Sequence, residues 1–546
     1  MLKNIITLSA IAAMATTSFA STEVQSQLDE MSKKIIKLEK QLKKNKRTLR
    51  DVKQQANNDN IKFDVDFRTA LDSIQYDHVS GKESKNSDLL TNRLWLGMGY
   101  APDANNLFKG KLSYNKAYGD TANHSQSNSP MGVGFANFDW ITNENATDNT
   151  VKVKEAYWLY MNDTFLGTEI PWTISMGRRP STDGLGINLR EGMKDNSPLS
   201  HTVNTEFDGG SAKFTLSELS GVEGMWFKLC AGRGLTNATP RFNMTIPGAD
   251  YVEDKTKSDD IDMYGFIFVP YDNGQYSVHM NWANAVNLIG FTNQSMQQFG
   301  MASQGYDPNS GTAQSGGMPT KYLNGSATAD ETGTPKAVQN GYDANGNYYQ
   351  NNNSLIPAAM MANAPQFQNF GDMELFTIMA KAEGIGDGIN DFLDDTIVFA
   401  SWAQSKTNPN NNMNMLGSND SETGNSTWLG VNMPCLLTDG RFGLEWNKGS
   451  KYWRSVTYAE DTLAGSKIAT RGTAFEVYYN KSLTKALNLN IRYTKMDYDY
   501  TGSNSFFGED GTPMSIRDAK AAYEAGTGPD VVESASDIRV SISYRY

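Results

Sequence analysis

Apolar and polar residues alternate with a period of two over most of the chain. The alternation begins at residues 61–68 and recurs as far as residues 538–546. Successive side chains of a β-strand point to opposite faces, so each such stretch has one apolar and one polar face. In the first stretch every polar position is charged (Lys62, Asp64, Asp66 and Arg68). Strands of this kind need lipid or packed protein on one side and water on the other.

Short and long connections alternate between the predicted strands, as they do in membrane barrels. The short ones are 101–106, 162–170, 217–221, 270–274, 383–391, 434–440 and 481–486. The long, polar ones are 71–90, 115–150, 179–205, 233–258, 285–370, 405–424, 449–469 and 498–534. This order predicts an all-β transmembrane antiparallel barrel at 61–546 with about 16 strands, or 18 if residues 451–458 form a strand of their own. A barrel of this size leaves an aqueous channel.

A soluble β-sandwich, β-helix or propeller is the rival architecture. The chain shows no internal repeat with a period of about 20 to 50 residues, which argues against solenoids and propellers. Long polar loops at every second connection are also unusual for a soluble sandwich. The membrane barrel is therefore the favoured architecture.

The first 20 residues have the features of a secretory signal. Lys3 precedes a short apolar run at residues 5–15, and Ser18-Phe19-Ala20 fits a cleavage site with small residues at its ends. An uncleaved anchor is the alternative. No later stretch approaches the ~20 consecutive apolar residues that a membrane helix requires.

Residues 21–56 change to a spacing of three and four residues, which is typical of a coiled coil. This predicts a short α-helical stalk that self-associates, although a single amphipathic helix lying on another surface has the same spacing. The seam consists of Leu28, Met31, Ile35, Leu38, Leu42, Asn45, Leu49 and Val52.

Composition changes this picture little. The chain has 39% hydrophobic and 11% aromatic residues, a formal net charge of −12 and 2 cysteines. The acidic balance argues against nucleic acid as a partner. A disulfide is not favoured, because Cys230 falls inside a predicted strand and Cys435 in a turn.

No motif points to catalysis, to a cofactor or to a metal. The four histidines are scattered, and no nucleophile elbow, phosphate-binding loop or haem-attachment motif is present. Asp343, Asn345 and Asn347 alternate as in a calcium loop, but the closing Glu is missing, so a polar turn is favoured. We therefore expect no enzyme activity.

The pair Arg178-Arg179 stands where a predicted strand runs into a Gly-containing loop with further charges. Strand parity sends one of the two arginines inward. Opposed charges on a loop folded into a lumen select ions. The predicted constriction consists of Arg178, Arg179, Asp183, Arg190 and Glu191. A surface loop with solvated charges is equally compatible with the sequence.

The connection at 285–370 is far longer than an ordinary loop, so it is expected to be functional or disordered. It has few charges and several methionines, which suit an adaptable or apolar contact. A plug in the lumen, an extracellular lid and a disordered loop all remain open.

The signal segment, the coiled coil, the alternating strands and the final aromatic residue together resemble trimeric porins of Gram-negative outer membranes. Residues 176–184 and 442–453 resemble segments of an uncharacterised porin-like family of epsilon-class proteobacteria. The resemblance implies a homotrimer, with its coiled coil in the periplasm. It also implies that the terminal face is read by the barrel-assembly machinery. That face consists of Ile538, Val540, Ile542, Tyr544 and Tyr546.

The favoured function is a channel in the outer membrane, surrounded by its lipid, for passive diffusion of small hydrophilic solutes or ions. Two alternatives remain: a barrel that sheathes a periplasmic or electron-transfer partner, and a tether between the outer membrane and the cell wall. Single-channel conductance separates the channel from the tether, and co-purified haem absorbance would favour the sheath.

Overall fold

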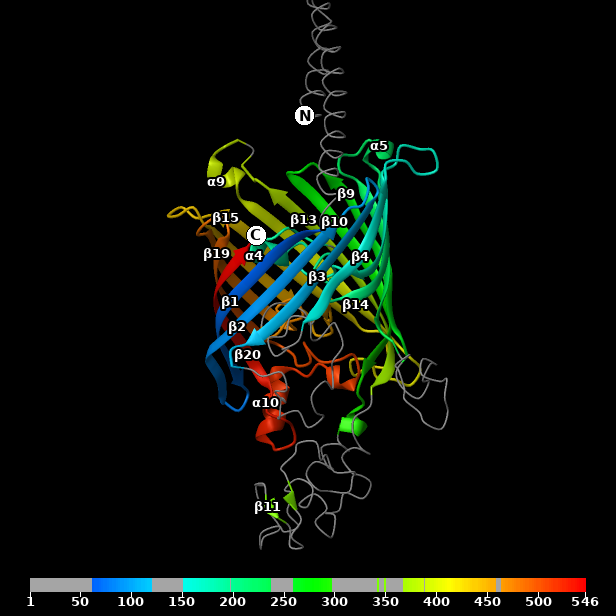
Figure 1. Cartoon of the computed structure of the whole chain (residues 1–546). Coiled ribbons are helices and arrows are strands. Elements are labelled where there is room, and N and C mark those ends of the chain that lie inside the picture. Colours follow the sequence, from blue (N-terminus) through cyan, green and yellow to red (C-terminus); the bar gives the residue numbers. More distant parts are fainter. Residues whose placement is uncertain are drawn as a thin grey trace, which may run out of the picture. The chain divides into compact units, whose positions relative to one another are not determined.

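Sixteen antiparallel strands close into a barrel in the computed structural model (Figure 1). The structure describes residues 61–119, 151–196, 198–236, 259–296, 341–342, 348–349, 367–386, 388–457 and 463–546. The ring closes where the first strand pairs with the last, with Asp66 opposite Arg545. The strands are β1 (Lys62–His78), β2 (Glu83–Tyr100), β3 (Asn106–Ala117), β4 (Lys152–Asn162), β5 (Trp172–Arg179), β7 (Phe207–Thr215), β8 (Trp226–Leu235), β9 (Ile261–Asp272), β10 (Tyr276–Gly290), β13 (Gln368–Glu383), β14 (Ile397–Pro409), β15 (Thr423–Pro434), β16 (Arg441–Gly449), β18 (Gly472–Ser482), β19 (Leu487–Tyr498) and β20 (Val532–Arg545).

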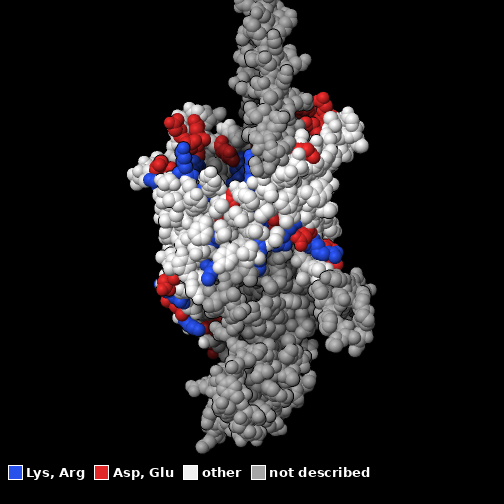
Figure 2. All heavy atoms as spheres, viewed as in Figure 1, with Lys and Arg blue, Asp and Glu red and all other residues white. Residues whose placement is uncertain are grey.

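The barrel has its apolar side chains outside and many of its charged ones inside. On β20, Ile538 and Ile542 are 50% and 45% exposed, whereas Asp537 and Arg539 are each 1% exposed. Figure 2 shows a band with few charged side chains between two rims where they gather. This distribution is the reverse of a water-soluble protein and suits a lipid surround.

Short and long connections alternate around most of the ring; the exceptions are the short link 79–82 and the links 384–396 and 410–422, which are equally long. One set of links comprises 101–105, 163–171, 216–225, 273–275, 384–396, 435–440 and 483–486; the other comprises 79–82, 118–151, 180–206, 236–260, 291–367, 410–422, 450–471 and 499–531. The prediction of about 16 strands is confirmed by the closed sheet. The alternative of 18 is wrong, because the closed barrel sheet has 16 strands and the described residues 451–457 contribute only the two-residue strand β17 (Val456–Thr457), which lies outside that sheet.

The long link expected at 71–90 is wrong. β1 and β2 continue through most of it, leaving a turn at 79–82. The pairing of β1 with β20 runs on through Gln75↔Ser536 and Asp77↔Ser534. These four side chains lie on the outward face, where polar residues replace the apolar ones, while Ile74 and Tyr76 pack inward. A search for apolar residues on the outward face therefore ends before the hydrogen-bonded strand does.

Short helices lie in the described connections, in addition to a 3-10 turn at Glu509–Gly511 and a helical stretch at 293–296. The helices include α4 (Ile187–Glu191), α5 (Ser217–Ser220), α9 (Asp391–Asp394) and α10 (Ile516–Glu524). Within the described ranges, no helix combines the length and apolarity needed to cross a membrane.

Both cysteines are free thiols, Cys230 in β8 and Cys435 in a turn, as the sequence predicted. Several predictions concern residues outside the described ranges. These are the signal segment at 1–20, the coiled coil at 21–56 with its seam, most of the connection 285–370, and the polar turn at Asp343, Asn345 and Asn347.

Candidate functional site

The connection between β5 and β7 folds into the barrel instead of lying on its surface. Leu185, Ile187 and Leu199 are buried against Phe399 and Trp428 of the barrel wall. Gly186 permits this approach because it has a φ of +104° and a Cβ at this position would lie 2.2 Å from the Trp428 ring. We call residues 180–206 the inner loop.

His201 anchors the inner loop to the wall through both ring nitrogens. Nδ1 lies 2.7 Å from the Ser401 hydroxyl on β14, and Nε2 lies 2.9 Å from the Ser426 hydroxyl on β15. The imidazole also packs edge-on against Trp428 and Trp453. Burial lowers the pKa of His201 to about 3, so the ring is neutral at physiological pH.

A second connection, residues 450–471, joins the inner loop. β17 pairs in parallel with β6 (Val203–Asn204) of the inner loop, with Val456 opposite Val203. The amide of Val456 donates to the Thr202 carbonyl at 2.9 Å. Trp453, Arg454 and Arg471 of this connection are fully buried, and Arg471 donates to the Trp453, Thr501 and Gly511 carbonyls. The two connections therefore support each other inside the lumen.

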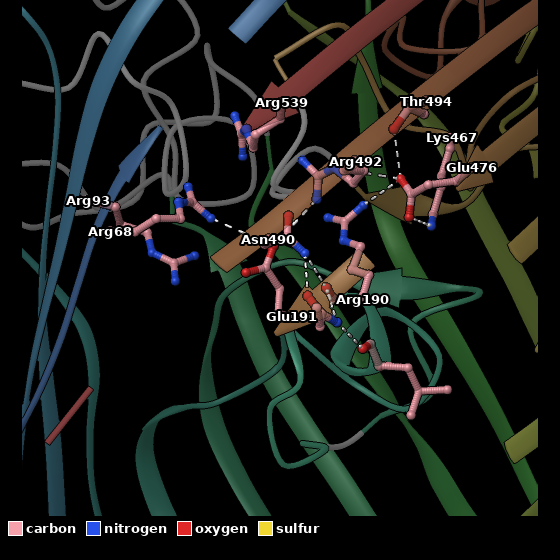
Figure 3. Close-up of polar contacts among 12 residues, drawn as sticks. Arg68, Arg93, Arg190, Glu191, Lys467, Glu476, Asn490, Arg492, Thr494 and Arg539 are labelled. Carbon is pink, nitrogen blue, oxygen red and sulfur yellow. Dashed lines mark hydrogen bonds and ion pairs between the residues drawn. The ribbon is translucent and has the colours of Figure 1, made fainter. Parts of the chain in front are cut away.

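Helix α4 presents Arg190 and Glu191 to the opposite wall (Figure 3). Arg190 Nη1 lies 3.4 Å from Glu476 Oε2 on β18, and Glu191 Oε1 lies 3.4 Å from Arg492 Nη1 on β19. The Arg190 carbonyl accepts from the Asn490 side-chain amide at 2.8 Å. The charges of the loop and the wall thus alternate in sign across the contact.

Lys467 joins two carboxylates at the centre of this cluster. Its Nζ lies 2.7 Å from Glu445 Oε2 and 2.6 Å from Glu476 Oε1. All three side chains are at most 1% exposed. Trp428 Nε1 donates to Glu445 at 2.9 Å, and the Thr494 hydroxyl donates to Glu476 at 2.8 Å. Buried charges require such partners, because leaving one alone is costly.

The cluster extends to the seam where the barrel closes. Arg539 Nε lies 2.5 Å from Asp72 Oδ1, and Arg545 Nε lies 2.9 Å from Asp66 Oδ2. The Arg545 guanidinium also donates to the Glu191 carbonyl at 2.8 Å, so the inner loop reaches the closing seam.

Comparison with known proteins places the chain in a family. Residues 83–546 match the family described as "Protein of unknown function (DUF3373)". The chain belongs to the DUF3373 family. No curated protein matches it.

The fold of this DUF3373 protein is similar to solved outer-membrane barrels. An anion-selective porin from Comamonas acidovorans has 11% identity and a TM-score of 0.41, with 89% of this chain and 99% of that chain covered. OprB from Pseudomonas putida has 10% identity and a TM-score of 0.41, with 89% and 94% covered. OmpF from Salmonella typhi, solved with daunomycin, has 10% identity and a TM-score of 0.38, with 89% and 98% covered.

The predicted constriction residues of this DUF3373 protein do not lie together. Arg190 and Glu191 lie in the charged cluster, but Arg178 and Arg179 face opposite sides of β5. Arg178 pairs with the exposed carboxylate of Asp208 at 3.3 Å and donates to the Val153 carbonyl. Arg179 points inward and stacks on the Tyr157 ring, 4.0 Å from its centroid.

Asp183 serves the turn that starts the inner loop. It is buried, has a φ of +58°, and its amide donates to the Asn204 side chain at 3.0 Å. Nearby, Lys154 Nζ reaches Glu206 Oε1 at 3.0 Å. Burial raises the pKa of Glu206, while the neighbouring Lys154 opposes that shift.

Several residues of the cluster are absent from the predicted site. They are Glu445, Lys467, Glu476, Arg492, Arg539 and Asp72. Glu445, Glu476 and Arg492 occupy the polar, inward positions of strands in which apolar and polar residues alternate, and this alternation could have identified them as inward-facing. Nothing in the sequence indicates which of these positions the inner loop contacts, because Arg190 and Glu476 are 286 residues apart.

The terminal face of β20 lies on the outside of the barrel. Ile538, Val540, Ile542, Tyr544 and Tyr546 are all at least 40% exposed. Their alternates Arg539, Ser541 and Ser543 are buried inside, so this strand has the inward and outward faces that its sequence predicted.

Proposed function

We propose that this protein is an outer-membrane channel through which small hydrophilic solutes or ions diffuse passively. The observation that carries the proposal is the inverted barrel: apolar side chains face outward and a charged lining faces inward. Sixteen strands enclose a lumen wide enough for water, whereas about eight strands are filled by their own side chains. The inner loop adds charges across this lumen, and this is how porins narrow and select.

From its inward cations we infer that the channel prefers anions. In the buried cluster, Arg190, Lys467 and Arg492 face acidic partners, so their fields largely cancel. Three inward cations lie on another part of the wall, namely Arg179 on β5, Lys213 on β7 and Lys228 on β8. Lys213 stacks on Trp226, and Arg179 stacks on Tyr157. A low-dielectric wall with net positive charge raises the local concentration of anions.

The resemblance to trimeric porins completes the proposal. It includes a homotrimer, a periplasmic coiled coil at 21–56, and recognition of the outward face of β20 by the barrel-assembly machinery. It also includes the relation to porin-like proteins of epsilon-class proteobacteria. Removing residues 21–56 should shift the particle in detergent from trimer to monomer. A full-length protein that is already monomeric would contradict that part.

Reversal potentials in planar bilayers test the channel and its preference together. With the full-length protein in a salt gradient, we expect single-channel steps and a reversal potential on the side of anion permeation. Arg179→Gln combined with Lys228→Gln should move the reversal potential toward zero. Lys448→Gln is the control, because Lys448 is half-exposed and paired with Asp499. Steps with unchanged selectivity in the double variant would contradict the assignment of these cations.

A further inference from the structure

A cavity of about 110 Å³ lies between the inner loop and the inner wall formed by β7, β8, β9 and β10. The space exists because small residues face inward at this part of the wall, namely Gly209, Ser211, Gly232 and Gly265. Larger apolar side chains also line it, namely Val203, Phe207, Met263 and Ile267.

Two cationic side chains share this lining, whose other members are mostly apolar, with Ser181, Ser211 and Asn281 as the polar exceptions. Arg179 and Lys228 both contribute to it, and none of the described residues that line it is an Asp or a Glu. Arg179 is held by its stacking on Tyr157, and within the described part of the chain its buried Nη1 has no hydrogen-bond partner. A buried guanidinium nitrogen of this kind is a donor that an incoming anion can satisfy.

The charged cluster around Glu476 differs from this cavity in one decisive way. There, cations and carboxylates already pair at 2.6–3.4 Å, so an anion would have to displace a protein carboxylate. At the cavity, an anion would meet Arg179 and Lys228, and no described residue of the lining is an Asp or a Glu.

We propose that this cavity binds a small monocarboxylate anion with a short apolar tail. The carboxylate would lie between Arg179 and Lys228, and the tail would pack on Phe207, Met263 and Ile267. An apolar cavity of ~150 Å³ holds benzene, so this slightly smaller one suits a ligand of about five non-hydrogen atoms, such as propionate. Inorganic phosphate fits less well, because the apolar lining would leave several of its oxygens without donors.

The proposal deepens the proposed channel function, since the ligand would reach the cavity through the lumen, but binding is measured without conduction. Titration calorimetry of the full-length protein in detergent with sodium propionate should give saturable binding. Arg179→Gln and Lys228→Gln should each weaken the affinity at least about tenfold. Lys213→Gln is the matched control, since Lys213 faces inward on the adjacent strand but does not line the cavity. Neutral propionamide should bind at least about tenfold more weakly than propionate.

Cys230 provides a second readout, because it lines the cavity. In a Cys435→Ser background, propionate should slow the reaction of the Cys230 thiol with a small anionic methanethiosulfonate. Cys230→Phe keeps both cations but fills the space, so it should abolish binding while the barrel still shows its heat-modifiable migration on gels. This variant covers the case in which loss of a buried cation prevents folding.

The absence of saturable binding and of Cys230 protection in the folded wild-type protein would overturn the proposal. Equal affinity of the wild type and the Arg179→Gln, Lys228→Gln double variant would do the same. If the wild-type protein conducts but does not bind propionate, only the cavity proposal fails. If it binds propionate but never conducts, the channel proposal fails.

Discussion

Replacing Lys467 by Met should destabilise the protein more than any other loss of a single charge in the buried cluster. Its ammonium lies 2.7 Å from Glu445 and 2.6 Å from Glu476, and it is 1% exposed. At an effective dielectric constant of about 20, each contact contributes about 6 kcal/mol of attraction. The cost of burying the three charges offsets much of this. Removing one partner of a buried ion pair typically costs about 3–5 kcal/mol, because the other charge is left alone.

Lys467→Met should fall at the upper end of that range, because two carboxylates lose their nearest cation. Arg190→Met should fall at or below the lower end, because Glu476 keeps Lys467 and the Thr494 hydroxyl. Adding Glu445→Gln to Lys467→Met should restore part of the loss, since one buried carboxylate is then neutral.

Urea unfolding of the protein in detergent or lipid, followed by tryptophan fluorescence, measures these differences in the free energy of unfolding. Trp428 donates to Glu445 and so reports on the cluster itself. Lys448→Met is the control, because its pair with Asp499 is about half-exposed and should contribute at most about 1 kcal/mol. If Lys467→Met unfolds with a free energy within about 0.5 kcal/mol of the Lys448→Met value, the reasoning about the buried cluster is refuted.

Three further predictions concern the inner loop. The free energy of unfolding should fall as the pH drops from about 6.5 to 3. The reason is that His201 becomes protonated below about pH 6.5 in the unfolded chain, whereas in the folded protein it stays neutral down to its pKa of about 3. The loss amounts to about 2 kcal/mol at pH 5. His201→Gln should remove that part of the pH dependence of urea unfolding, and equal pH slopes in both proteins would contradict it. Gly186→Ala should cost about 1–3 kcal/mol through its positive φ and its contact with Trp428, whereas Gly99→Ala, which meets nothing within 4 Å, should be nearly neutral in the same assay. Val203→Cys with Val456→Cys, in a Cys230→Ser, Cys435→Ser background, should form a disulfide on oxidation because the two residues are paired in β6 and β17; unlinked chains on non-reducing gels would show that the two connections do not meet.

The sequence was most informative where one physical requirement acts on every second residue. β20 illustrates this, because lipid outside and water inside impose apolar and polar character on Ile538 and Arg539 in turn. The alternation was misleading beyond the apolar band, where β1 continues with polar Gln75 and Asp77 on its outward face and Ile74 on its inward face. The two-residue strand β17 was likewise mistaken for a possible barrel strand, because its burial comes from the inner loop rather than from lipid.

The inner loop was predictable in part. The charges of Arg190 and Glu191 indicated a loop that narrows a lumen, and both lie inside the barrel. Their partners Glu476 and Arg492 could not be assigned, because pairing between a loop and a distant strand depends on barrel closure and leaves no local spacing. Arg178 and Arg179 are adjacent in sequence but separate to the two faces of β5, so only Arg179 remains in the proposed selectivity wall.

The reversal potential of the full-length wild-type protein in a planar bilayer under a salt gradient tests the central claim most directly. A channel with this lumen should give discrete current steps and a potential on the side of anion permeation. A correctly folded protein that inserts into the bilayer but gives no steps, or that prefers cations, would contradict the account.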